Sequence, residues 1–236
     1  MPISVAQIRQ IMKLSISSAW SGLPEETVSQ LAAQATARHL NSGDLLFEAG
    51  DVGDGCYRLD KGVLKVRLTS PQGAERIIAV LGEGSIVGDL AMIDGLPRSA
   101  SVVALTDCEL RFISREAFQE YTKWHPEIQA FLVKVLARRL RGTDDTIAAL
   151  AFLTATGRVA NALLELAGVL GKKTNTGSVV ISNMLSQKDL AAFAGVSREN
   201  TNRILRRLQD KEAFVKSSTG YRLDVAKLQE ALAWEE

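Results

Sequence analysis

The stretch PEIQAFLVKVLARRLRGTDDTIAALAFLT, residues 126–154, decides how the rest of the chain is arranged. It has no proline after Pro126, which suits the first turn of a helix, and its one glycine is Gly142. Seven side chains recur in it at alternating steps of three and four: Val133, Leu136, Leu140, Thr143, Ile147, Leu150 and Thr154. This spacing predicts a helix in which these seven side chains form a seam, that is, a stripe along one side that packs against another helix. A second copy of the chain is the expected partner.

The middle of this seam carries a hydroxyl group, Thr143, which is flanked by Gly142 and Asp144. A polar group at this position is consistent with a seam that does more than hold two helices together. The alternative is an imperfect coiled coil with one tolerated threonine, and the helix alone does not separate the two.

Length and composition set broad limits on the protein. Its 236 residues suffice for one large domain or two ordinary ones, and 46% hydrophobic with 23% charged residues is typical of a soluble globular protein. No apolar run approaches the ~20 residues that span a bilayer, and the stretch from Met1 to Leu14 lacks a signal-peptide core. We therefore expect a cytoplasmic protein with no membrane partner.

The two cysteines, Cys56 and Cys108, stand alone, with no CxxC pair and no histidines at metal-ligand spacing. This pattern argues against a disulfide framework, a zinc site and a four-cysteine iron–sulfur cluster. We expect no metal.

Charge is distributed unevenly along the chain, although the net charge is only +1. Residues 155–236 hold 12 Lys/Arg and 9 Asp/Glu, a balance of +3, and the remainder holds 16 and 18, a balance of −2. A mildly basic C-terminal part permits nucleic-acid binding without requiring it.

Residues 41–115 have the character of a β domain. Ten of the 18 glycines fall between positions 43 and 95. Apolar and charged side chains alternate in short runs such as 64–68 and 109–112, and Ser70-Pro71-Gln72-Gly73 reads as a turn. Many short strands predict a closed or rolled β structure, which encloses packed side chains or a small ligand.

The flanking segments are predicted to be mainly helical. Residues 1–40 read as helices. After the seam, Thr154–Gly157 breaks the apolar repeat and is interpreted as a hinge, and Arg158–Leu170 has one apolar helical face. Lys172–Ser178 reads as a polar loop, and Val179–Ile181 as a short strand.

Two short runs suit a phosphate-bearing ligand, Gly88-Asp89-Leu90 and Arg98-Ser99-Ala100. Glycine lets a backbone approach a ligand closely, and adjacent arginine and serine side chains donate several hydrogen bonds to phosphate oxygens. Asp89 would repel a phosphate and instead suits hydroxyl groups such as those of a ribose. The alternative is a surface ion pair between Asp89 and Arg98 that brackets a loop.

The run from Ser186 to Lys211 predicts two helices joined by a tight turn. Ser186 and Asp189 form a capping-box pattern, Gly195-Val196 makes the turn, and Ser197 caps the second helix. Arginine suits the acceptors of guanine and glutamate suits the amino group of cytosine, so the pattern predicts a DNA-binding helix-turn-helix. The alternative is a solvated charged helix in a three-helix bundle. The stretch from Phe214 to Leu223 reads as a hairpin wing.

These runs together resemble the CRP/FNR family of bacterial transcription regulators, and the cyclic-AMP receptor proteins in particular, over roughly residues 40–225. The matching runs are Gly88-Asp89-Leu90 with Arg98-Ser99-Ala100, Leu150-Ala151-Phe152-Leu153 with Thr156-Gly157-Arg158, and Val196-Ser197-Arg198-Glu199 with Arg203-Ile204-Leu205. The resemblance implies an α+β fold in three parts: a cyclic-nucleotide-binding β-roll with N-terminal helices in residues 1–125, a dimerisation helix in 126–154, and a winged helix-turn-helix in 155–236.

By this resemblance, the side chains of Arg98 and Ser99 would hold a cyclic phosphate, Gly88 and Asp89 the ribose, and Thr143 the base. The full set of expected ligand-binding residues is Gly88, Asp89, Leu90, Arg98, Ser99, Ala100, Thr143 and Asp144. The expected DNA-binding residues are Lys188, Ser197, Arg198, Glu199, Asn202 and Arg203, among which Arg198, Glu199 and Arg203 match the readers of a TGTGA-like half-site. The expected partners are a palindromic operator, a second copy of the chain and RNA polymerase.

The chain departs from the family pattern at two positions. Asp89 stands where glutamate is usual, and Asp144 stands where the cyclic-AMP receptors carry a serine that reaches the base from the partner subunit. A carboxylate accepts hydrogen bonds from the N–H edge of guanine, so we expect cyclic AMP to bind and cyclic GMP to bind detectably as well.

Other functions have less support in the sequence. A redox sensor of the same fold needs clustered cysteines, and a haem sensor is weakly indicated by Pro2, whereas His39 and His125 lie outside the candidate ligand site. A regulatory module of a kinase or channel does not explain the helix-turn-helix. A phosphodiesterase would need a catalytic arrangement that is not visible, so we expect no enzymatic activity.

Overall fold

The computed structural model describes residues 35–174, 178–182, 185–216 and 220–234. The chain divides into two compact units, and the division falls within helix α5 (Pro126–Phe152), between Arg139 and Leu140. The short segment Glu75–Ile77 is grouped with the C-terminal unit. The predicted α+β fold is confirmed, with a β domain, a long helix and a helix-turn-helix domain. The helices predicted within residues 1–34 lie outside the described residues.

The N-terminal unit is a roll of two four-stranded antiparallel sheets. One sheet has the order β1 (Thr36–Leu40), β8 (Cys108–Ser114), β3 (Gly55–Lys61), β6 (Ile86–Val87); the other has β2 (Leu45–Phe47), β7 (Ser101–Ala104), β4 (Leu64–Thr69), β5 (Glu75–Leu81). Side chains from both sheets form one buried core, which includes Leu40, Tyr57, Leu59, Leu64, Val102 and Leu110. The predicted turn joins β4 to β5, where the Gly73 N–H donates to the Ser70 carbonyl at 2.9 Å.

One prediction for this unit was wrong. Thr36–Leu40 had been read as helical, but it is strand β1 and pairs with β8 along its whole length. Only Leu40 of the strand is buried, so its sequence lacks the apolar alternation that marks a strand. Pairing with a distant segment decides its structure.

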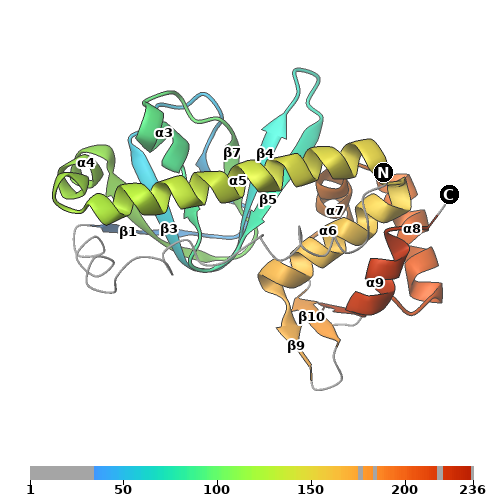
Figure 1. Ribbon diagram of the computed structural model, residues 1–236. Coiled ribbons are helices and arrows are strands. Elements are labelled where there is room, and N and C mark those ends of the chain that lie inside the picture. Colours follow the sequence, from blue (N-terminus) through green and yellow to red (C-terminus); the bar gives the residue numbers. More distant parts are fainter. Residues whose placement is uncertain (1–34, 175–177, 183–184, 217–219, 235–236) are drawn as a thin grey trace. The chain divides into compact units, whose positions relative to one another are not determined.

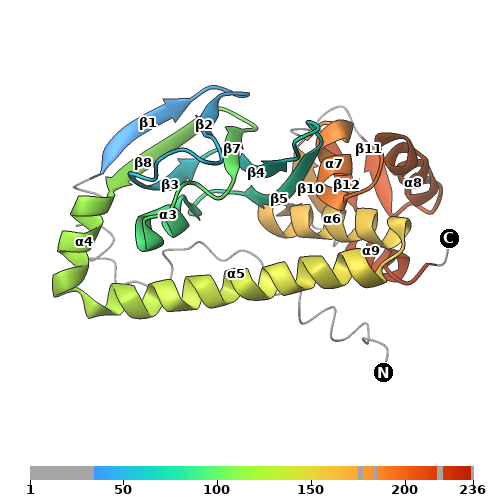
Figure 2. The same cartoon turned by 90° about the horizontal axis from the view of Figure 1, so that it is seen from above.

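Helices also pack against the roll. Helix α3 (Asp89–Asp94) lies beside strand β3 (Figure 1), and α4 (Arg115–Trp124) leads from β8 into α5 (Figure 2). Ile128, Phe131 and Val135 of α5 are buried with Met92 of α3 and Phe118 of α4. The first part of α5 thus belongs to the packing of the roll.

The predicted seam occupies a continuous helix, because α5 runs from Pro126 to Phe152. Val133, Leu140 and Ile147 are seven residues apart and are each at least 60% exposed, and Leu150 and Phe152 are exposed as well. The hinge is narrower than predicted: Thr154 is the N-cap of α6 (Ala155–Leu170) and accepts the Gly157 N–H at 3.1 Å. The break therefore lies at residues 153–154, and Gly157 is already helical.

The C-terminal unit contains the predicted helix-turn-helix and wing. Its helices after α6 are α7 (Gln187–Ala194), α8 (Arg198–Asp210) and α9 (Val225–Ala231). Its sheet has the strand order β11 (Phe214–Lys216), β12 (Gly220–Leu223), β10 (Val179–Ser182), β9 (Lys172–Lys173). Lys172–Lys173 had been predicted as loop, and it forms a two-residue strand because its backbone pairs with β10. Helix α9 was not predicted.

Candidate functional site

The candidate ligand site begins at Gly88, where strand β6 ends and α3 starts. Gly88 has φ of 83°, and a Cβ atom there would lie 2.4 Å from Arg98 Nη1. Left-handed backbone and close approach both require glycine at this position. Gly88 therefore lets the arginine lie directly against the backbone at the start of α3.

Arg98 is buried, with 4% of its surface exposed, and is held from several sides. Its Nη1 donates to the carbonyls of Gly55 (2.7 Å) and Gly88 (2.8 Å), and its Nη2 pairs with Asp54 Oδ1 at 2.9 Å. Its guanidinium lies 4.3 Å from the centre of the Phe47 ring. Among the described residues its Nε has no hydrogen-bond partner. A buried cation with an unused donor suits an anionic ligand.

Asp89 is the most buried charged residue of this site, with 1% exposed. Arg139 Nη1 of α5 lies 2.7 Å from its Oδ1, and within the described part of the chain its Oδ2 has no hydrogen-bond partner. Arg139 also donates through Nη2 to the Ile86 carbonyl at 3.0 Å. The alternative of an Asp89–Arg98 surface pair is wrong, because both side chains are buried and their ion partners are Arg139 and Asp54.

The remaining predicted ligand-binding residues differ in how exposed they are. Ala100 is buried, whereas Leu90 and Ser99 are exposed, so the Ser99 hydroxyl is available to a ligand. Thr143 and Asp144 are exposed on α5, in the C-terminal unit. Their contribution to the ligand site stays a prediction.

Two residues of the site were missed from the sequence, Asp54 and Arg139. Arg139 could have been found, because it precedes Thr143 by four residues and therefore shares its face of the helix. Asp54 lies in a loop before β3 and carries no local signal.

The candidate DNA-binding site begins with the two predicted caps. Ser186 and Asp189 form a reciprocal capping box at the start of α7, and Gly195 ends that helix with φ of 65°. The Ser197 side chain accepts the Asn200 N–H at the start of α8. The turn and the entry into the second helix are thus fixed by local hydrogen bonds.

Helix α8 separates an apolar face from a charged one. Ile204, Leu205 and Leu208 are buried. Arg198, Glu199 and Arg203 are exposed, Asn202 is partly buried, and Lys188 is exposed in the first turn of α7. Asn200, which was not predicted, accepts bonds from Arg203 Nε (3.2 Å) and Nη2 (2.8 Å) and thereby orients that guanidinium.

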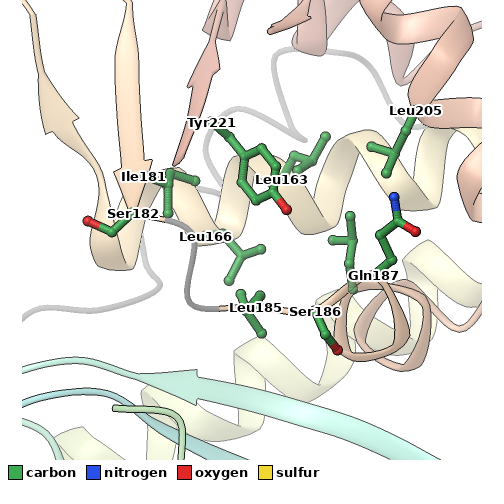
Figure 3. A pocket seen from close by; sticks show the side chains of 10 residues that line it. Leu163, Leu166, Ile181, Ser182, Leu185, Ser186, Gln187, Leu205 and Tyr221 are labelled. Carbon is green, nitrogen blue, oxygen red and sulfur yellow. The ribbon is translucent and has the colours of Figure 1, made fainter. Parts of the chain in front are cut away.

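A small hollow lies inside the C-terminal unit (Figure 3). Its lining is mainly apolar and includes Leu163, Leu166 and Leu205, with Tyr221 and Gln187 beside them. It has room for about one water molecule, so it is too small for a nucleotide.

Both cysteines are free and buried in the roll. Burial raises the pKa of the Cys56 thiol to about 12, and it also raises the pKa of the Cys108 thiol. Neither thiol is therefore ionised at neutral pH.

Within the described ranges, no three His, Cys, Asp or Glu side chains gather as a metal site would require. In the same part of the chain, no helix has the length and apolar character needed to cross a bilayer.

Both units match known protein families. Residues 37–124 match the cyclic nucleotide-binding domain, and residues 157–231 match the Crp-like helix-turn-helix domain. The chain is 31% identical over 186 residues to a CRP-like cAMP-activated global transcriptional regulator of Mycobacterium tuberculosis, covering 79% of this chain and 83% of that protein.

A second relative and a solved structure agree with this match. The chain is 33% identical over 171 residues to the cAMP-activated global transcriptional regulator CRP of Salmonella typhimurium, covering 72% of this chain and 80% of that protein. The crystal structure of the Thermus thermophilus catabolite activator protein is similar with a TM-score of 0.53 and 32% identity, covering 92% of this chain and 98% of that one.

Proposed function

The chain belongs to the CRP/FNR family of transcription regulators, and we propose from this premise that it is a homodimeric DNA-binding protein controlled by a cyclic nucleotide. The observation that carries the proposal is the pair of opposite buried charges, Arg98 and Asp89, at one corner of the roll. Each retains an unpartnered polar atom among the described residues. A cyclic nucleotide offers a matching anionic phosphate and a ribose hydroxyl.

The residues present fit such a ligand. Arg98 would donate to the phosphate, helped by the exposed hydroxyl of Ser99, and Asp89 would accept from the ribose hydroxyl. Gly88 keeps the backbone close enough for this, and Leu90 and Ala100 complete the two runs. When bound, the nucleotide would supply a negatively charged phosphate and a base. The protein supplies buried, preoriented donors and acceptors, which make each contact stronger than it would be in water.

The exposed seam supports dimerisation through α5. Val133, Leu140 and Ile147 form an apolar ladder with heptad spacing, and Leu150 lies on the same seam. These side chains are exposed in the single chain, and a second copy offers an identical ladder against which they can pack. We infer a parallel pair of α5 helices, in which Thr143 and the partner's residue at position 144 meet the base.

Control of DNA binding would follow from differential affinity. A nucleotide that touches both the roll and α5 interacts differently with two arrangements of the helix pair, and only such a difference shifts an equilibrium. The break at residues 153–154 would pass the shift to α8. Two α8 helices must lie about 34 Å apart to enter successive major grooves, so the expected operator is palindromic. Arg198, Glu199 and Arg203 would read a TGTGA-like half-site, and RNA polymerase is the expected further partner.

The base preference is proposed to be relaxed. Asp144 is exposed, and its carboxylate accepts from the N–H groups of guanine as readily as it accepts from the amino group of adenine. Cyclic AMP is the expected ligand by analogy with the cAMP-activated relatives, and the acceptor at Asp144 predicts measurable binding of cyclic GMP as well.

A titration of a fluorescent palindromic TGTGA duplex tests the proposal, with no nucleotide, cyclic AMP or cyclic GMP added in turn. Cyclic AMP should tighten DNA binding, and Arg98→Leu should abolish that effect. Ser99→Ala is the matched control, because its exposed hydroxyl is not needed for folding, and it should weaken the nucleotide effect only partly. Glu199→Ala should relax base preference while calorimetry shows unchanged nucleotide binding. A monomeric protein, or equal DNA affinity with and without nucleotide, would refute the proposal.

A further inference from the structure

The C-terminal segment Leu232–Trp234 contacts the start of α6. The Thr154 hydroxyl donates to the Trp234 carbonyl at 3.2 Å while it accepts the Gly157 N–H at 3.1 Å, so both of its roles are used. A Cβ atom on Gly157 would lie 3.0 Å from the Leu232 carbonyl. Residues 232–234 are therefore fitted closely against the first turn after the break in the long helix.

The same segment also contacts helix α8. The Arg207 guanidinium, in the last turn of α8, lies 5.3 Å from the centre of the Trp234 ring, a distance typical of a cation–π contact. Trp234 thus touches the N-cap of α6 with its backbone and the end of α8 with its ring. Helix α9 anchors the segment, because Leu228, Ala231 and Leu232 are buried.

We propose that Leu232–Trp234 is a clamp that ties the start of α6 to the end of α8. Trp234 is then a positioning residue for DNA recognition, which acts through Thr154 and Arg207. The clamp holds the helix break at residues 153–154, because the Trp234 carbonyl favours the capping conformation of Thr154 over continuation of the helix. It also makes any rotation of α6 about this break move α8 as well.

Hydrogen exchange tests the clamp without any ligand or DNA. In Trp234→Ala, the amides of residues 154–160 and those of residues 205–211 should both exchange several-fold faster than in the wild type. Trp234→Phe keeps an aromatic face and should restore most of the protection. Glu230→Ala, an exposed change on the same helix, is the matched control and should leave both segments unchanged. Faster exchange in only one of the two segments, or in neither, would overturn the clamp.

Operator binding gives a second readout, and its coupling to Arg207 distinguishes the positioning role from a general loss of stability. With nucleotide bound, Trp234→Ala should weaken DNA binding by about three- to tenfold, because a cation–π contact is lost and α8 is less well oriented. Nucleotide affinity should be unchanged. In an Arg207→Met background, Trp234→Ala should weaken DNA binding less than it does in the wild type, because only the route through Thr154 remains. Effects of the two substitutions that multiply in full would contradict the proposed route through Arg207. The titration of the wild-type protein distinguishes the clamp from the proposed function, on which this second readout rests. If wild-type DNA binding does not respond to nucleotide, the proposed function is refuted, and the hydrogen-exchange experiment still tests the clamp.

Discussion

Removing either partner of the Asp89–Arg139 pair should have very unequal consequences for stability. Asp89 is buried, whereas the Arg139 side chain is 40% exposed, and the two are joined at 2.7 Å. Arg139→Met leaves a buried carboxylate without its cation. Asp89→Asn removes the buried charge and leaves a cation that can turn towards water.

The structure allows both magnitudes to be worked out. Stranding the charge of a fully buried pair costs about 3–5 kcal/mol, and because water already reaches Arg139 we expect a smaller cost, about 2–3 kcal/mol. Loss of the hydrogen bond to the Ile86 carbonyl adds about 1 kcal/mol. Asp89→Asn should cost about 1 kcal/mol or less, since the amide still occupies the same volume.

Urea unfolding at neutral pH, followed by circular dichroism, measures these differences. The double variant Asp89→Asn with Arg139→Met should be clearly more stable than Arg139→Met alone, because no stranded charge remains. The reasoning is refuted if Arg139→Met is no more destabilising than Asp89→Asn, or if the two effects simply add in the double variant.

Three further predictions concern Glu165, the exposed seam of α5 and Gly88. Burial raises the pKa of Glu165 to about 6, above its ordinary 4.5, so the folded state binds a proton that the unfolded chain releases and stability falls as the pH rises through this range. Glu165→Gln should remove that fall and raise the unfolding free energy at pH 7 by at most about 2 kcal/mol, measured by urea unfolding across pH. Lysine in place of both Leu140 and Ile147 should give a monomer in sedimentation experiments, and a dimer would exclude α5 as the interface. Gly88→Ala should lower nucleotide affinity at least about tenfold in calorimetry, because its Cβ displaces Arg98 and a lost charge-assisted bond has roughly that value.

Caps, turns and helices that depend on interactions between residues close in sequence were predicted correctly. The caps at Ser186 and Ser197 and the turn at Gly195 depend on residues within three or four positions, and all are present as expected. The long helix was readable for the same reason, since its apolar spacing is local.

Features decided by distant partners could not be predicted. Strand β1 exists because it pairs with β8, about 70 residues away, and its own side chains are mostly exposed. The partner of Arg98 is Asp54, which lies 44 positions earlier in a loop. The two runs identified Asp89 and Arg98 but not their ion partners, Arg139 and Asp54, because pairing depends on how the roll closes.

The burial of Cys56 and Cys108 has a practical consequence for testing the proposed dimer in solution. These are the only two cysteines of the chain, and their protonated, enclosed thiols should resist maleimide reagents. A cysteine introduced at the exposed Lys172 would then be the single attachment point for a fluorophore. Two such dyes, one on each copy, would report the separation of the DNA-binding domains by energy transfer without removing any native residue from the core.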